Sequence, residues 1–165
     1  MTRVACLCLA LALLTVRPAS ASDSPRDRAT LKGLKGVAVI VESLEAVVER
    51  DGLTASQLQT DVELRLRQSG IRVIEAAGDP DVPVLYVNVN AMKQSTGNTY
   101  VYEAEVSVFQ TCRIIATNGF ALAQTWSVSN VASVGVANFG RVARDLVRDE
   151  TDKFINAFLS VNSTP

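Results

Sequence analysis

The sequence predicts a two-layer α/β (α+β) sandwich, in which a mixed sheet of about five strands carries two helices on one face. Two observations lead to this fold. A helix bounded by Thr54 and Gly70 lies between two valine-rich segments, which is typical of a β-α-β unit. After it the hydrophobic pattern alternates over three segments, and an amphipathic helix closes the chain. The predicted order is therefore β-α-β-β-β-β-α.

The first residues have the pattern of an export signal. Arg3 gives a positive start, residues 4–16 are apolar, and residues 19–21 are small, as at a cleavage site. The apolar run is shorter than the roughly 20 residues that span a bilayer. We expect a cleaved signal peptide over residues 1–21, with an uncleaved anchor as the alternative, and a periplasmic or extracellular protein. Residues 22–31 are expected to be a disordered lead-in, and residues 32–165 a single α/β domain.

Composition excludes several classes of function. The chain of 165 residues is 48% hydrophobic and 20% charged, as in a folded domain, and its net charge of -1 includes no basic cluster. Nucleic acid is therefore not an expected partner. The chain has no His, and only Cys112 remains after the predicted cleavage, so the usual general base, metal ligand and disulfide are missing. We expect no catalytic residue, no metal and no cofactor.

The first part of the domain is the best specified. Residues 37–44 are apolar on both alternations, which predicts a strand covered on both faces. Thr54 and Gln57 form a capping-box pattern, and Leu53 with Leu58 forms a hydrophobic staple around it. Gly70 ends the helix, and residues 71–76 are predicted to be a short strand parallel to the first.

The alternating segments predict an antiparallel meander. Pairing Asn90 with Glu103 places Val89 opposite Ala104, so that apolar residues meet on one face and polar residues on the other. The same register places Val87 opposite Val106. Residues 100–115 and 120–134 are predicted to be the next two strands, joined at Asn118-Gly119.

The Asn-Gly pair predicts a two-residue hairpin turn, in which Thr117 pairs with Phe120. Counting outward from that turn leads to a candidate partner surface on the sheet face away from the helices: Phe109, Trp126 and Val128. A bulge in either strand would reverse this assignment and bury Trp126 under a helix. The sequence leaves both arrangements open.

The last helix begins at Asn138 and has an apolar stripe opposite charged residues at i,i+4 spacing, which indicates a solvated face. Glu150 falls inside the apolar stripe, near Lys153. It is expected either at the rim of the interface, with Lys153 as its partner, or as a buried acid with a raised pKa. Cys112 shares the alternation of Val106 and Val108 and is predicted to be a buried free thiol.

Three stretches carry a resemblance: residues 60–67 with Gly70-Ile71, residues 86–90, and residues 147–150 with 154–156. They resemble a family of uncharacterised exported bacterial proteins, which implies no site residues. The element order is loosely similar to periplasmic assembly domains, the amino-terminal domain of TolB and LptE, although the lipid-attachment cysteine of LptE has no counterpart. This similarity implies an assembly or interaction module without catalysis.

These observations together predict an exported, non-catalytic interaction or assembly domain with a protein partner or self-association. The alternative is a carrier of a small apolar or lipid ligand, bound between the sheet and the helices. A carrier of that kind needs an enclosed pocket of roughly 300 Å³ or more.

Overall fold

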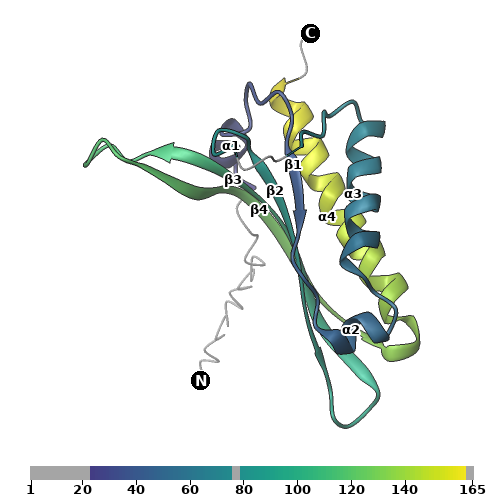
Figure 1. Cartoon of the computed structure of the whole chain (residues 1–165). Coiled ribbons are helices and arrows are strands. Elements are labelled where there is room, and N and C mark those ends of the chain that lie inside the picture. The colour runs from purple at the N-terminus through teal and green to yellow at the C-terminus, as the bar shows by residue number, and fades with distance from the viewer. Residues whose placement is uncertain (1–22, 76–78, 163–165) are drawn as a thin grey trace, which may run out of the picture.

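One four-stranded mixed sheet forms one layer of the molecule, and two helices on one of its faces form the other (Figure 1). The computed structural model describes residues 23–75 and 79–162, so the predicted signal peptide lies outside the described residues. The strands are β1 (Ala38–Val41), β2 (Val84–Lys93), β3 (Thr99–Arg113) and β4 (Phe120–Gly135), in that spatial order. Strand β1 runs parallel to β2, and the other neighbours are antiparallel. The two-layer α/β prediction is confirmed.

The strand count is four rather than the predicted five. Within residues 71–76, Val73 forms only an isolated parallel bridge with Val37. Ile71 is not available for pairing, because it is buried at the end of the preceding helix and its N–H donates to the Leu66 carbonyl at 2.9 Å. The crossover thus brings the chain beside β1, as predicted, but no strand extends there.

Helix α3 (Ala55–Gln68) has the ends that its sequence predicts. The Thr54 hydroxyl accepts from the Gln57 N–H, and the Gln57 side chain accepts from the Thr54 N–H, both at 3.3 Å. Leu53 and Leu58 are fully buried on either side of this capping box. Gly70 follows the helix with a φ of 77°, a conformation that glycine adopts without strain.

Thr54→Ala is expected to lower the free energy of unfolding by about 1 kcal/mol, because one amide of the first turn loses its acceptor. Thr54→Ser keeps the hydroxyl and is the matched control. Urea melts of the two variants measure the difference. Equal midpoints for the alanine and serine variants would show that the capping hydroxyl contributes nothing.

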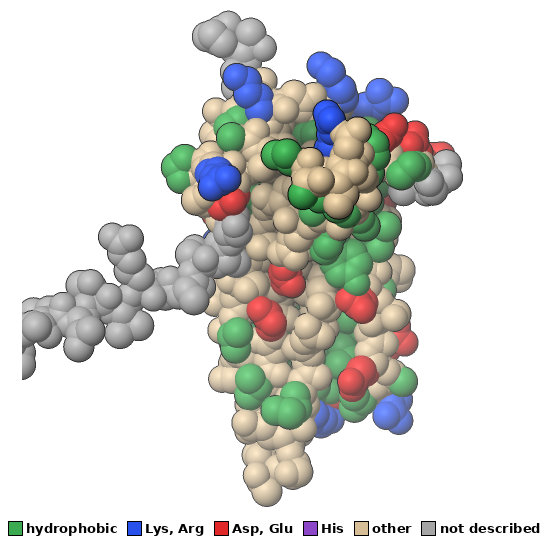
Figure 2. Space-filling view, turned by 90° about the vertical axis from the view of Figure 1, so that its left-hand side faces the viewer, with side chains coloured by type: hydrophobic (Ala, Val, Ile, Leu, Met, Phe, Trp, Pro, Cys, Tyr) green, Lys and Arg blue, Asp and Glu red, His purple; other side chains and the backbone are tan. Residues whose placement is uncertain are grey.

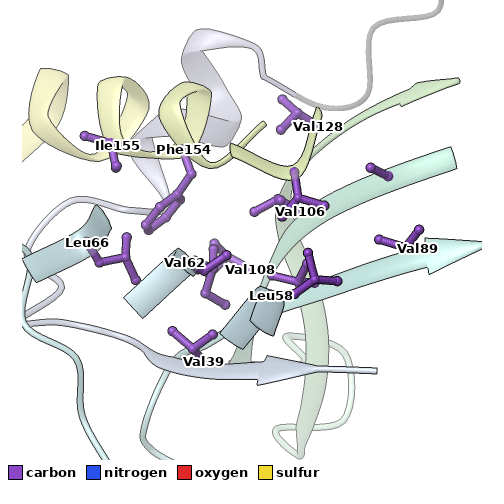
Figure 3. Close-up of a cluster of buried hydrophobic side chains, with 14 of the residues drawn as sticks. Val39, Leu58, Val62, Leu66, Val89, Val106, Val108, Val128, Phe154 and Ile155 are labelled. Carbon is purple, nitrogen blue, oxygen red and sulfur yellow. The ribbon is translucent and has the colours of Figure 1, made fainter. Parts of the chain in front are cut away.

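The predicted β2–β3 register is confirmed. Val89 lies opposite Ala104 and Val87 opposite Val106, while Asn90 pairs with Glu103. The buried residues of both strands face helix α3 and helix α4 (Phe139–Asn162). Figure 3 shows this core, in which Leu58 and Val62 from α3, Val106 from β3 and Phe154 from α4 converge.

The first turn of α4 packs closely against the loop that leads into α3. Gly140 lies so close to the loop between α2 and α3 that an added Cβ would come within 2.7 Å of the Gly52 carbonyl oxygen. A larger residue would force the first turn of α4 away from the entry to α3. Between them, helix α2 (Ala46–Arg50) and the short 3-10 helix η1 (Val136–Asn138) complete this end of the fold.

The expected disordered lead-in over residues 22–31 is wrong for the part that the structure describes. Helix α1 (Pro25–Ala29) is capped by Ser24, and Leu31 is fully buried. Asp23 accepts from Arg28 at 2.7 and 2.5 Å and from the Trp126 indole N–H at 2.8 Å. Burial raises the pKa of Asp23, but these hydrogen bonds outweigh it and hold the pKa below its usual value. The polar composition of the segment did not reveal this anchoring, because it depends on Trp126, which is far away in the sequence.

The environment of Cys112 also differs from the prediction. Its side chain is half-buried, although it continues the alternation of Val106 and Val108 in β3. The reason is position along the strand: the end of β3 extends beyond the layer of α3 and α4 (Figure 1). Alternation gives the face of the sheet, but it does not say whether a helix covers that face.

Candidate interaction surfaces

The three residues predicted to form a partner surface do not lie together on the open face. Trp126 is 0% exposed and Val128 is 5% exposed, both under the helices. The Trp126 ring packs edge-to-face against Phe154, with 5.5 Å between ring centroids. Phe109 alone lies on the open side, where it packs edge-to-face against Tyr86 at 5.8 Å. The predicted partner surface of Phe109, Trp126 and Val128 is therefore wrong. The structure has the bulged arrangement, in which Trp126 is buried.

The cause is a single extra residue in β4. Val108 pairs with Trp126, but Phe109 pairs with Gln124, so Thr125 is left without a partner in the ladder. The loop at the hairpin is also longer than predicted, since Arg113 rather than Thr117 pairs with Phe120. This moves the β3–β4 register by four residues, an even number, so each side chain stays on the face of the sheet that was predicted for it. The bulge adds one residue to β4, so the β4 side chains from Trp126 onward lie on the opposite face from the predicted one.

The open face of the sheet is largely polar. Glu103 and Glu105 of β3 point outward, and Glu105 accepts from the Gln124 side chain at 3.1 Å. The Tyr86 hydroxyl donates to Glu42, which raises the pKa of Tyr86 to about 12. Figure 2 shows acidic side chains over this side of the molecule, below the projecting end of the β3–β4 hairpin. The face differs from the apolar patch that the sequence register predicted.

Strand β4 has a neighbour on one side only. The Val136 N–H donates to the Asn98 carbonyl at 2.9 Å, and in an antiparallel pair the bonded and non-bonded residues alternate. Even-numbered residues of lower β4 therefore bond to β3. Of the residues whose N–H and C=O groups point outward, Ser127 is buried, and the others form what we call the free edge: Ser129, Val131, Ser133 and Gly135. Above it, the segment after α1 reaches β4, where the Thr30 hydroxyl donates to the Thr125 carbonyl at 3.3 Å.

The free edge lacks the features that usually keep sheet edges apart. From Phe120 to Gly135, strand β4 has no charged residue and no proline. Natural edge strands are normally protected by charges, proline, a β-bulge or a covering segment. In β4 the bulge and the covering segment lie only at Thr125, above the free edge. At the centre of the free edge, the Val131 side chain is 64% exposed.

The far end of the hairpin forms a second exposed surface. We call residues 109–124 the β3–β4 arm, which extends from the sheet on the side away from α3 and α4 (Figure 1). Apolar side chains near its tip are strongly exposed: Ile115 is 96%, Phe120 73% and Leu122 66% exposed. Arg113 lies opposite Phe120 and donates to the Asn118 side chain at 2.5 Å.

A groove of about 470 Å³ lies between the two helices, and no strand residue lines it. Two ion pairs join α3 to α4 there: Arg144 with Asp61 at 2.7 Å, and Arg65 with Asp152. Its lining residues are Gly52, Leu58, Asp61, Val62, Leu64, Arg65, Gln68, Gly140, Arg141, Arg144, Asp145, Val147, Arg148 and Thr151. This is not the space between sheet and helices that the predicted carrier requires.

The α4 charges are only partly paired within their own helix. Arg141 and Asp145 form the expected i,i+4 pair at 3.5 Å, but Asp152 pairs with Arg65 across the groove. Glu150 is fully buried, and both of its carboxylate oxygens accept from the Lys153 ammonium group at 2.8 Å. The sequence identified both the inward position of Glu150 and its partner. It missed the cross-helix pairs, because they depend on how α3 and α4 are packed.

Among residues 23–75 and 79–162, no three His, Cys, Asp or Glu side chains are placed to hold a metal ion. Within the same residues, no helix is both long and apolar enough to cross a membrane.

No protein-family model matches the chain, and no curated protein matches its sequence. Several solved structures are similar to it, among them the two that follow. A PelC dodecamer from Paraburkholderia phytofirmans has a TM-score of 0.46 and 19% identity, over 74% of this chain and 89% of that one. A minor lipoprotein from Acinetobacter baumannii has a TM-score of 0.40 and 13% identity, over 76% of this chain and 93% of that one. Neither is TolB or LptE, so the loose similarity to those domains stays a prediction.

Proposed function

We propose that the chain is an exported, non-catalytic assembly domain that associates with a second copy of itself through the free edge of β4. The observation that carries this proposal is a long edge strand with open hydrogen-bonding groups and no charge or proline. Export rests on the signal-like pattern of residues 1–21. The absence of His from the sequence supports a function without acid–base catalysis.

The free edge is compatible with pairing to itself. In an antiparallel pair centred on Val131, this residue lies opposite the partner's Val131, and Ser129 lies opposite the partner's Ser133. No charged residue of either strand is brought against a like charge. Pairing satisfies the open N–H and C=O groups of both copies and joins two four-stranded sheets into one.

The carrier alternative has weaker support. The 470 Å³ groove lies between the helices and is lined by several ion-paired side chains rather than by apolar ones alone. No specific observation favours an apolar ligand there.

Val131→Lys is expected to abolish the self-association, because it places two ammonium groups directly opposite each other across the shared edge. Met92→Lys is the matched control: Met92 is 67% exposed on β2, close to the 64% of Val131, but it lies away from the free edge. Sedimentation velocity over a range of concentrations measures the association.

The expected result is a concentration-dependent dimer for the unmodified chain and for Met92→Lys, and a monomer for Val131→Lys. Circular dichroism should show the same fold in all three. A chain that stays monomeric at every concentration, or a Val131→Lys variant that dimerises normally, would refute edge pairing.

A further inference from the structure

The tip of the β3–β4 arm has apolar groups on both faces of the ribbon and in the loop, with Thr111 and Arg113 beside them on the face of Phe120. Phe120 and Leu122 lie on one face of the ribbon, Ala121 and Cys112 lie on the other, and Ile115 lies in the loop at the end. Phe120, Leu122 and Ile115 are each at least 66% exposed. A partner protein would need a deep socket to cover such a tip, whereas a fluid apolar medium covers all of its sides at once.

Charge is almost absent from this part of the chain. Between Glu105 and Arg141 the only charged residue is Arg113, although 20% of the whole sequence is charged. No carboxylate therefore lies on the arm itself to oppose entry into an apolar phase.

The position of the one cation also has a meaning. Arg113 lies at the level of Phe120 and donates to Asn118, and it has no ion-pair partner among the residues that the structure describes. Arg113 lies nearer the loop than Leu122, whose ladder partner is Thr111. Its guanidinium group has further N–H donors, and phosphate oxygens are acceptors that match them. The acidic side chains of the open face lie below the arm in Figure 2, whereas Asp79 and Asp81 flank Pro80, whose carbonyl accepts from the Thr111 hydroxyl at the base of the arm at 2.5 Å.

The length of the apolar tip fits the depth of a membrane interface. Leu122 and Phe120 are two residues apart along β4, which is about 7 Å at the usual strand rise, and the loop extends beyond them. Segments that lie in the headgroup and acyl boundary are buried by about 5–10 Å. The arm could thus enter the interface while the folded body stays outside.

We propose that the β3–β4 arm is a lipid-binding element, which places Ile115 among the acyl chains, Phe120 at their border, and Arg113, at the level of Phe120, against the headgroup phosphates of an anionic lipid surface. This goes beyond the assembly function and does not depend on it, because the arm and the free edge of β4 use different residues.

The test places a fluorophore on the arm of the full chain. Phe120→Trp reports on the tip, and Met92→Trp, at a residue of similar exposure on β2, is the matched control. The resident Trp126 is buried and gives the same background in both variants. Each variant is mixed with vesicles of phosphatidylcholine alone, or with added phosphatidylglycerol, in which the acyl chains carry bromine as a short-range quencher.

The emission of Phe120→Trp is expected to shift to shorter wavelength and to be quenched by the brominated lipid, more strongly on the anionic vesicles. Met92→Trp should change in neither respect. In the Phe120→Trp chain, Ile115→Asp should weaken vesicle binding at least about tenfold, because a carboxylate replaces an aliphatic group that inserts among the acyl chains. Arg113→Gln should remove the preference for anionic vesicles.

Three outcomes overturn the proposal. The first is a Phe120→Trp emission that neither vesicle changes. The second is an equal response from Met92→Trp, which would mean that vesicle contact is not made by the arm. The third is a shift that grows with protein concentration without lipid, which would make a second copy the occupant of the tip.

Discussion

Trp126→Ala is expected to lower the free energy of unfolding by about 4 kcal/mol. The indole is fully buried, packs against Phe154, and donates its N–H to Asp23. Its removal leaves a cavity in the core and also releases the segment that α1 belongs to. Urea denaturation followed by circular dichroism measures the loss, since the variant has no tryptophan left to report by fluorescence.

Trp126→Phe separates the two contributions. It keeps an aromatic ring against Phe154 but removes the donor to Asp23, so it should cost clearly less than the alanine variant. The native protein should also show shielded tryptophan emission at short wavelength. If Trp126→Ala melts like the unmodified chain, then Trp126 does not lie in the core and the bulged register is wrong.

Lys153→Met is expected to cost about 3 kcal/mol, because it leaves the buried Glu150 carboxylate without its cation. The Lys153 side chain is 47% exposed, whereas that of Glu150 is 1% exposed, so the loss comes from the stranded acid rather than from the lysine itself. Arg141→Met is the matched control, since Arg141 pairs with Asp145 on the exposed surface of the same helix. Surface pairs of that kind contribute about 0–1 kcal/mol.

The double variant Glu150→Met with Lys153→Met provides a stricter test. Replacing both members of a buried pair by apolar groups often restores stability, so the double variant should melt well above Lys153→Met. If Lys153→Met and Arg141→Met have the same midpoint in urea, the Glu150 carboxylate is not isolated from water as the structure indicates.

The sequence predicted best where the governing contacts are local. Helix α3 could be bounded at both ends, because Thr54, Gln57 and Gly70 act on neighbouring backbone groups. The β2–β3 register followed from matching apolar with apolar residues and polar with polar residues.

The prediction of the partner surface failed because one extra residue in β4 reverses which of its side chains face the helices. Nothing in the composition of β4 marks Thr125 as a bulge, and the choice is made by tertiary contacts. The Thr125 hydroxyl is bonded to Gln110, and the Thr125 carbonyl accepts from Thr30, a residue far away in the sequence. Without these contacts the candidate surface at Phe109, Trp126 and Val128 could not be rejected. The exposed arm was missed for the same reason, because its exposure depends on where α4 lies.

The docking of the amino-terminal segment has a consequence for the order in which the chain acquires its structure. Asp23 accepts from Trp126 of β4, and the Leu31 carbonyl accepts from the Asn162 side chain at the end of α4 at 2.9 Å, so this first segment is anchored by residues of the second half of the sequence. Closing such a long loop has an entropic cost, and the contacts that offset this cost form only when both ends are present. A polypeptide that emerges from the ribosome amino terminus first cannot complete this end until α4 has been synthesised. The stretch directly behind the predicted signal peptide therefore cannot dock onto the fold until synthesis is nearly complete, which is compatible with threading through a narrow translocation channel.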